Sequence, residues 1–303
     1  MPDIQKVNES LEAAVQSLLN LKKALNEEPQ VQAQSESPLP KEKTVDYDSF
    51  ESLKNAVKSD KWPAAVNPNL ICDPNSQKDK EERARGIIEL MIEEDLKGKK
   101  FLDFGCGDGS VVATSTEYET ELSVGFDISQ QPWEPREGSI FTYDYEVVVQ
   151  NGPYDIILLF DVLDHLKAEP PVTVLKKLKS LLKNDGKIYM RCHPFVSRHG
   201  THLYHELNKA YLHLVFTNDE LNELVPNSKY KEENIGITYP IKTYSEYIKE
   251  AELNVLNRRD LTEKVEGFFQ IPKIADRIME KTKFEHFPEF QMSLQFIDFI
   301  LSK

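Results

Sequence analysis

The sequence predicts an α/β fold with a doubly wound, mostly parallel seven-stranded sheet and an N-terminal helical extension. Three observations support this prediction. Strand and helix patterns alternate from residue 99 onward. The pattern IILLF at 156–160 is continuously apolar, as a strand covered on both faces of a sheet requires. A glycine-rich turn, FGCGDGS at 104–110, directly follows the first strand pattern.

The first 44 residues form two segments that differ from the rest of the chain. Apolar residues recur at alternating steps of three and four over 4–25, which predicts an amphipathic helix of about three heptads. Such a helix forms a short homo-oligomeric coiled coil, or it lies on its own domain or stays partly formed. Residues 26–44 are rich in Pro, Gln, Ser and Glu, which is typical of a flexible linker.

The elements of the remaining domain, 45–303, follow from their patterns. Helices are predicted at 46–59 and 77–96, with an ordered loop at 62–76 between them. The buried face of the second helix is expected to consist of Ile87, Ile88, Leu90, Met91 and Ile92. Further helices are predicted at 172–183, 218–225 and 243–251. Strands are predicted at 99–104, 121–127, 139–144, 154–160, 186–192, 251–259 and 292–301.

Composition limits the class of partner. The 37 basic and 51 acidic residues give a formal charge of −14, which repels a phosphate backbone, so nucleic acid is a disfavoured partner. Cys72, Cys106 and Cys192 are far apart and in no C-x-x-C pair, which argues against disulfides and thiolate zinc sites. No leader pattern and no apolar run of ~18 residues is visible. We therefore expect a soluble, cytoplasmic protein without membrane contact.

The glycine turn suits an adenosine-bearing ligand, and two details indicate its kind. A dinucleotide fingerprint requires a third small residue, Gly or Ala, at position 110, where this chain has Ser110. Asp103 lies two positions before the first glycine, and its carboxylate repels a pyrophosphate but suits an ammonium or sulfonium group. The turn therefore favours a cationic ligand.

Several segments together resemble a known family. LDFGCGDGS at 102–110 resembles motif I of class I S-adenosylmethionine-dependent methyltransferases, in which D/E-x-G-x-G-x-G is typical. ELSVGFDIS at 121–129, YDIILLFDVLDHL at 154–166 and LKSLLKNDGKIYMRC at 178–192 resemble later motifs of the same family. The resemblance covers about residues 80–303. It implies a Rossmann-like methyltransferase fold with an antiparallel last strand, and S-adenosylmethionine as the cofactor.

The resemblance also divides the domain into four parts. Residues 45–98 are expected to form an N-terminal helical cap, and residues 99–192 the cofactor-binding core. Residues 193–240 are expected to form an acceptor-side insertion, and residues 241–303 the C-terminal half of the sheet.

Cofactor contacts follow from the matched motifs. The resemblance implies that Asp103 holds the amino group of the cofactor and that Asp127 accepts hydrogen bonds from the ribose hydroxyls, with Ile128 on the adenine. Asp144 is a candidate for the adenine amino group, and an exposed turn acid is the alternative at this position. The other expected cofactor contacts are Phe104, Gly105, Cys106, Gly107 and Phe160.

The acceptor region follows the fourth and fifth strands. Five of the seven histidines lie in the tract 191–213, a titratable cationic segment in an acidic chain. His165, His193 and Asp161 are candidate catalytic residues, because an acceptor that carries a proton must lose it. Arg191, Arg198 and His199 are candidate contacts for an acceptor that carries carboxylate or phosphate.

Two other interpretations of these histidines remain. His199, His202 and His205 are spaced as H-x-x-H-x-x-H, but no carboxylate with ligand spacing follows beyond Glu206, and we predict no metal. Alternatively, the histidines cover a helical cap and bond to water and backbone.

Three hypotheses about function remain open. The first is a methyltransferase that acts on a small molecule or a protein group and forms an oligomer through 4–25. The second is a catalytically silent protein of the same fold that binds partners through its N-terminal helix. The third is a dinucleotide oxidoreductase, against which Ser110 and Asp103 weigh. No D/N-P-P-Y or Pro-Cys motif is present, which argues against amino-methylating and cytosine-C5 nucleic-acid enzymes.

Overall fold

The structure is a computed structural model that describes residues 47–68, 73, 75–166, 169–200, 203–226 and 241–303. The helix predicted over 4–25 and the linker predicted over 26–44 lie outside the described residues. Cys72 and His202 also lie outside them.

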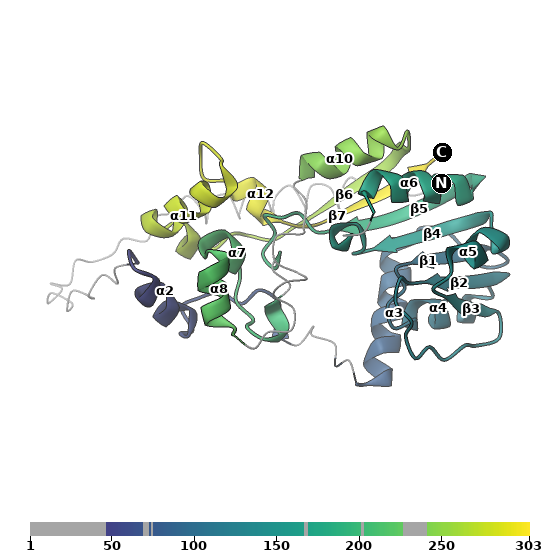
Figure 1. The fold of residues 1–303 in the computed structure, drawn as a ribbon, viewed down its shortest axis with the longest axis horizontal. Helices are drawn as coiled ribbons and strands as arrows, with labels where there is room; N and C mark the ends of the chain where they lie inside the picture. The colour runs from purple at the N-terminus through teal and green to yellow at the C-terminus, as the bar shows by residue number, and fades with distance from the viewer. Residues whose placement is uncertain (1–46, 69–72, 74, 167–168, 201–202, 227–240) are drawn as a thin grey trace, which may run out of the picture. The chain divides into compact units, whose positions relative to one another are not determined.

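A seven-stranded sheet has the strand order β3-β2-β1-β4-β5-β7-β6 (Figure 1). All neighbours pair in parallel except β7, which is antiparallel to β5 and β6. The predicted doubly wound, mostly parallel sheet is therefore confirmed. Its order reverses between β1 and β4, and the carboxyl ends of these strands form the switch point where such sheets bind ligands. The strands are β1 Lys100–Phe104, β2 Leu122–Phe126, β3 Ser139–Thr142, β4 Tyr154–Phe160, β5 Leu182–Cys192, β6 Asn254–Thr262 and β7 Leu294–Ser302.

Helices cover both faces of the sheet (Figure 1). One face carries α5 (Tyr145–Asn151), α6 (Pro171–Leu181) and α10 (Ile241–Glu250). The other face carries α3 (Gln77–Met91) and α4 (Ser110–Ser115). α3 begins where predicted because the Ser76 hydroxyl accepts a hydrogen bond from the Asp79 N–H at 3.2 Å. Short 3₁₀ turns lie at Thr116–Tyr118, Leu163–His165, Leu203–His205 and Gly267–Gln270.

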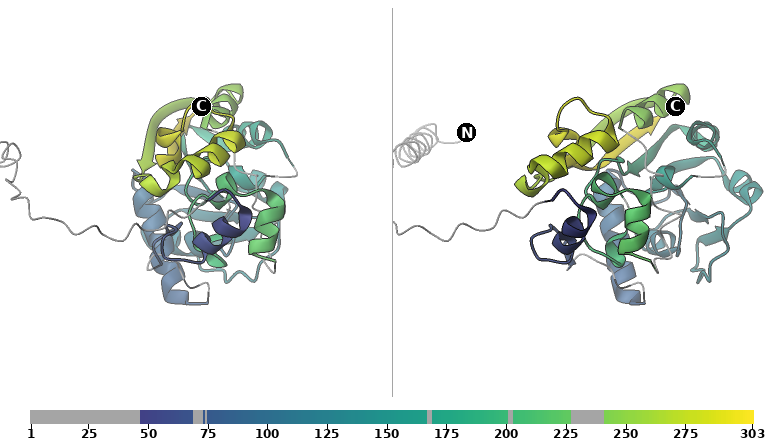
Figure 2. Two further views of the ribbon diagram at one scale, coloured as in Figure 1. Left: turned by 90° about the vertical axis from the view of Figure 1, so that its left-hand side faces the viewer. Right: turned by 60° about the vertical axis from the view of Figure 1, so that its left-hand side comes forward.

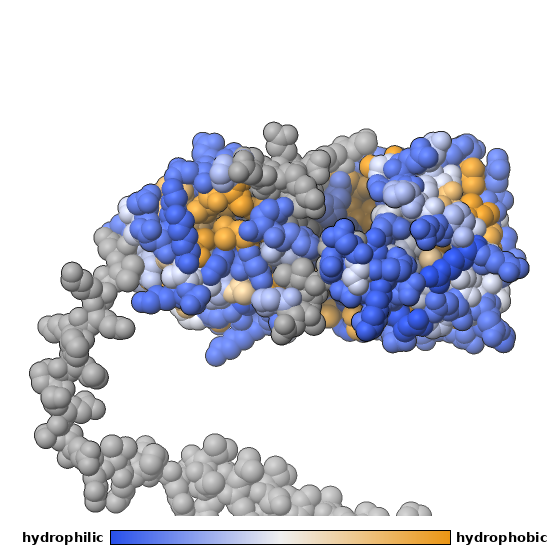
Figure 3. All heavy atoms as spheres, turned by 90° about the horizontal axis from the view of Figure 1, so that it is seen from below, coloured by the Kyte–Doolittle hydropathy of each residue, from blue (hydrophilic) through white to orange (hydrophobic). Residues whose placement is uncertain are grey.

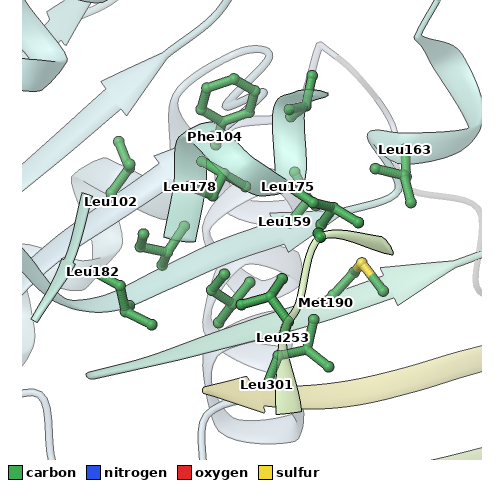
Figure 4. Packing of buried hydrophobic residues seen from close by; sticks show 14 of the residues in the cluster. Leu102, Phe104, Leu159, Leu163, Leu175, Leu178, Leu182, Met190, Leu253 and Leu301 are labelled. Atoms are coloured by element: carbon green, nitrogen blue, oxygen red, sulfur yellow. The ribbon is translucent and has the colours of Figure 1, made fainter. Parts of the chain in front are cut away.

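Strands β1, β2, β4 and β7 are largely buried on both faces, as their apolar patterns predict, whereas the edge strand β6 is mostly exposed. Figure 4 shows Leu175 and Leu178 of α6 close to Leu159 of β4, and all three side chains are fully buried. On the other face, α3 buries Ile87, Ile88 and Met91, and Ile92 follows them. The expectation that Leu90 belongs to this face is wrong. Leu90 is 44% exposed because the helical period turns it away from the sheet.

Several element boundaries differ from the predicted ones. β5 begins at Leu182, four residues earlier than predicted, because Leu182 pairs with Tyr154 of β4. α6 therefore ends at Leu181. β7 begins at Leu294 because Glu289–Ser293 form the short helix α12. These shifts lie at the ends of elements, where residues suit helix and strand almost equally.

A second set of helices has a core of its own. We call this set the cap; unlike the N-terminal helical cap predicted over 45–98, it does not include α3. It comprises α2 (Phe50–Val57), α7 (Leu212–Val215), α8 (Asn218–Leu224), α11 (Pro272–Thr282) and α12, with the loops that adjoin them (Figure 2). Trp62 is buried at its centre, stacked on Phe216 at 5.6 Å and edge-on to Phe268 and Phe269. Phe269 is fully buried in this core, and Phe268 is partly buried against it.

Hydrophilic side chains cover most of the face shown in Figure 3, and apolar side chains gather in small areas among them. This distribution agrees with the high share of charged residues, 29% of the chain. Over the described ranges, no helix combines the length and the apolar character that crossing a bilayer requires.

Candidate active site

The glycine turn joins β1 to α4 at the switch point. Gly105 and Gly107 have φ angles of +85° and +49°, a region that favours glycine. A Cβ at Gly105 would lie 2.4 Å from the side chain of Val162, so Gly105 makes room for the segment after β4. A Cβ at Gly107 would meet no atom within 4 Å. Gly107 therefore faces open space, where a ligand can approach the backbone.

Asp103 is the next-to-last residue of β1, beneath this turn, and is only 3% exposed. Burial raises the pKa of its carboxyl to about 7, against the opposing influence of Arg83 on α3. A buried carboxylate is costly unless a cation pairs with it. Its position therefore suits a cationic ligand group, as the motif predicts.

Asp127 follows β2 and faces the turn. One carboxylate oxygen accepts a hydrogen bond from the Gly107 N–H at 2.9 Å, and the other accepts bonds from the N–H and hydroxyl of Ser129. The next residue, Ile128, is 84% exposed. An apolar side chain this exposed at the ligand edge of the sheet is available to pack on an aromatic ligand.

The other predicted cofactor residues lie along the same edge, in different surroundings. Phe104 packs on Phe126 at 4.8 Å, and burial raises the pKa of the Cys106 thiol, which keeps it protonated. Phe160 lies at the end of β4. Asp144 is exposed, and its carboxylate caps α5 by accepting a hydrogen bond from the Glu146 N–H at 3.0 Å. Asp144 thus begins α5, and its contact with the adenine amino group stays a prediction.

A cavity of about 770 Å³ lies between the carboxyl ends of β4 and β5 and the cap. All the predicted catalytic and acceptor residues line it: Asp161, His165, Arg191, His193, Arg198 and His199. The wall on the cap side includes Ala64 to Asn67 and Tyr204, and Lys80 and Arg83 of α3 line another side. The fold thus brings together residues that are more than 100 positions apart in the sequence.

Asp161 and His193 form a pair in this cavity. The backbone of Asp161 is left-handed, with φ +54°, and its Oδ1 lies 3.1 Å from His193 Nε2. Burial lowers the pKa of His193, but Asp161 and the nearby Asp164 outweigh this effect and leave that pKa raised. Burial also raises the pKa of Asp164. Strained backbone and shifted proton affinities are typical of catalytic groups.

Two of the three arginines that line the cavity, Arg191 and Arg198, each have a carboxylate partner. Arg191 donates two hydrogen bonds to Asp298 of β7, at 2.6 and 2.8 Å, and its guanidinium lies over the ring of Phe160 at 5.2 Å and that of Phe296 at 4.7 Å. Arg198 pairs with Glu266 and donates to the backbone carbonyl of Ala64 at 3.0 Å. Their charges are therefore already balanced within the chain.

The histidines of the tract 191–213 have separate surroundings. The His199 ring is edge-on to the His193 ring at 4.7 Å, and burial with the nearby His193 holds the pKa of His199 well below its usual range. His213 lies in the cap beside the Phe195 carbonyl, and burial lowers its pKa to about 4. His213 thus corresponds to the alternative of a backbone-bonded cap histidine. Within the described ranges, no three His, Cys, Asp or Glu side chains are grouped as metal ligands.

Two residues of the site were not identified from the sequence. Arg83 is exposed on α3, lines the cavity and acts electrostatically on Asp103. Asp298 neutralises Arg191 from 107 positions away. One sequence signal could have indicated that Arg83 lines the cavity. It lies one helical turn after Lys80, on the helix that precedes β1 and the glycine turn.

A family model described as "Methyltransferase domain" matches residues 76–232, more than half of the chain. The chain belongs to this methyltransferase family. S-adenosylmethionine is the methyl donor of the family, and the sheet order with an antiparallel seventh strand is the Rossmann-like fold that the class I motifs imply.

Individual relatives are distant. A ubiquinone biosynthesis O-methyltransferase of Neisseria meningitidis is 21% identical over 148 residues, which are 45% of this chain and 57% of that protein. The chain thus matches little more than half the length of this curated relative. Among solved structures, 1,6-didemethyltoxoflavin-N1-methyltransferase of Burkholderia thailandensis is 12% identical, with TM-score 0.40 and coverage of 76% and 79%. A methyltransferase of Archaeoglobus fulgidus is 15% identical, with TM-score 0.42 and coverage of 75% and 95%.

Proposed function

We propose that this chain transfers a methyl group from S-adenosylmethionine to a neutral hydroxyl group on a small aromatic molecule. The observation that carries the proposal is the Asp161–His193 pair, which lines the cavity at the carboxyl ends of β4 and β5. A hydroxyl is a weak nucleophile until it loses its proton, so an acceptor of this class needs such a pair.

The chain's own residues fit the donor. When bound, S-adenosylmethionine supplies an electrophilic methyl group on its sulfonium. Asp103 and Arg83 place opposite charges together, as the ammonium and carboxylate of the methionine part require. Asp127 retains one lone-pair site for a ribose hydroxyl, on the oxygen that accepts from Gly107, and Ile128 provides an apolar surface for adenine.

Asp161 and His193 would take the acceptor's proton. The pair carries one negative charge when His193 is neutral, and it can then accept a proton from a hydroxyl in the cavity. Asp161 is the more exposed partner, at 24% against 6%, so we expect it to face the acceptor. His193 would then orient the carboxylate from behind.

The acceptor is neutral because Arg191 and Arg198 already have carboxylate partners. Asp298 and Glu266 balance Arg191 and Arg198, so an anionic acceptor would have to compete with both carboxylates. The cavity walls also include the aromatic side chains of Phe160, Tyr204 and Phe296, which suit a flat ring. An O-methyltransferase among the relatives supports the same acceptor atom.

The test is a methylation assay with isotope-labelled S-adenosylmethionine. Phenols and catechols are compared with anilines and benzoates of the same ring size. We expect label transfer to the hydroxyl compounds. Failure of every hydroxyl compound, with transfer to an aniline or benzoate, would contradict the proposal.

The pH dependence tests the role of the pair. We expect kcat/KM to rise with pH through an apparent pKa above 6.5, the usual value for histidine, as His193 loses its proton. His193→Asn should lower kcat about 10²- to 10⁴-fold and remove this rise. His286→Asn, at an exposed position, is the matched control and should leave the profile unchanged. An unaltered profile in His193→Asn would exclude the pair as the proton acceptor.

A further inference from the structure

The connection between β2 and β3 contacts the glycine turn through Trp133. Its indole N–H donates a hydrogen bond to the carbonyl of Gly107 at 2.9 Å. The indole stacks on Phe141 of β3, with ring centroids 5.6 Å apart and an interplanar angle of 15°. Trp133 is therefore fixed by β3 at one side while it holds the turn at the other.

The third glycine of the turn makes room for this stack. A Cβ at Gly109 would lie 2.6 Å from the Phe141 ring and 2.8 Å from the Trp133 ring. The bare backbone at Gly109 thus accommodates aromatic side chains of the chain itself, whereas Gly107 faces open space. The two glycines have different functions although the motif repeats every second residue.

The backbone at Gly107 is consequently held on both sides. Its N–H donates to Asp127 and its carbonyl accepts from Trp133, both at 2.9 Å. Both partners belong to the connection after β2, and Asp127 is also the expected ribose ligand. The orientation of the Gly107 backbone is thereby linked to the position of the ribose-binding carboxylate.

We propose that Trp133 is a positioning residue for S-adenosylmethionine. It acts through Gly107, by holding the turn in the conformation that leaves space for the methionine part and directs the Gly107 N–H at Asp127. The inference rests on the assignment of this edge to S-adenosylmethionine. It gives a role in cofactor affinity to a residue outside the methyltransferase motifs.

The chain contains a matched control, because its only other tryptophan is Trp62. Trp62 also donates to a backbone carbonyl at 2.9 Å and stacks on a phenylalanine at 5.6 Å, but it lies in the cap core. Trp133→Phe should raise the Kd for S-adenosylhomocysteine about three- to tenfold, the effect of one lost hydrogen bond. Trp62→Phe should lower the melting temperature and leave that Kd unchanged.

Fluorine NMR of the wild-type protein labelled with 5-fluorotryptophan provides a second readout that needs no substitution. Saturating S-adenosylhomocysteine should shift the Trp133 signal and leave the Trp62 signal in place. An unchanged Kd in folded Trp133→Phe, or an unshifted Trp133 signal on a wild-type protein that binds the ligand, would refute the role of Trp133. Absence of binding to the wild-type protein would instead refute the cofactor assignment, and with it this inference.

Discussion

At the residue scale, Asp103 is the most unusual charge in the cofactor region. Its carboxyl is buried, its pKa is raised to about 7, and no histidine, lysine or arginine is hydrogen-bonded to it among the described residues. A cationic ligand would supply the missing partner. Burying this carboxyl destabilises the free protein, and a bound cation relieves that cost, so the burial favours binding. Such a trade of stability for function is common at functional sites.

The raised pKa predicts how cofactor affinity depends on pH. Only the ionised form of Asp103 attracts an ammonium group, so affinity is full above about pH 7 and decreases as the pH falls below it. We expect the Kd for S-adenosylhomocysteine to rise by up to about tenfold per pH unit below about 7. Calorimetric titrations below about pH 7.5, where the ligand's amino group keeps its proton, measure this change.

Asp103→Asn provides the comparison for that titration. Its affinity should be lower than that of the wild type at pH 7.5 and nearly constant between about pH 5.5 and 7.5, because an amide does not titrate. Parallel pH profiles for the two proteins would show that another group controls binding.

At the element scale, one carboxylate connects three strands. Asp298 of β7 accepts hydrogen bonds from Arg191 of β5 and from Arg259 of β6. Asp298→Asn would leave Arg191 buried without a countercharge, and we expect it to lower the free energy of unfolding by about 3–5 kcal/mol. Urea unfolding followed by circular dichroism measures this loss.

The pair Arg258–Asp260 on β6 is the matched control for this prediction. It has similar geometry, with an Nε–Oδ1 distance of 2.7 Å, but its side chains are 38% and 31% exposed. Asp260→Asn should therefore cost less than about 1 kcal/mol. Equal losses in the two variants would mean that burial does not determine the strength of these pairs.

At the scale of the whole molecule, one prediction concerns residues outside the described structure. The heptad pattern over 4–25 predicts that the full chain is an oligomer held by this segment. Light scattering after size-exclusion chromatography should give a multiple of the chain mass for the full protein. Removal of residues 1–30 should yield a monomer, and an unchanged mass after removal would disprove the role of this segment.

The sequence predicted well those features that depend on neighbouring residues. The strand that contains Asp103, the positive-φ glycines after it and the acid at Asp127 are local properties of strand–turn units, which the backbone geometry largely dictates. The pocket residues Asp161 and His193 were also predicted, because they follow the fourth and fifth strands, whose carboxyl ends must meet at one edge.

Charge balance was not predictable in the same way. Arg191 and Arg198 indicate an anion site when only their own tract is considered. Their carboxylate partners, Asp298 and Glu266, lie 107 and 68 positions away. Which distant acid reaches a given arginine depends on strand pairing and cap packing, and the sequence pattern contains no information on either.

By itself, the sequence determined the order of strands and helices, the glycine turn and the acids beside it, because hydrophobic periodicity and turn chemistry act over a few residues. Only the tertiary structure decided which glycine faces the ligand space, which carboxylates pair with Arg191 and Arg198, and that Trp133 holds the turn. These properties arise where side chains from separate elements meet, and close packing in three dimensions, rather than chain neighbourhood, selects those partners.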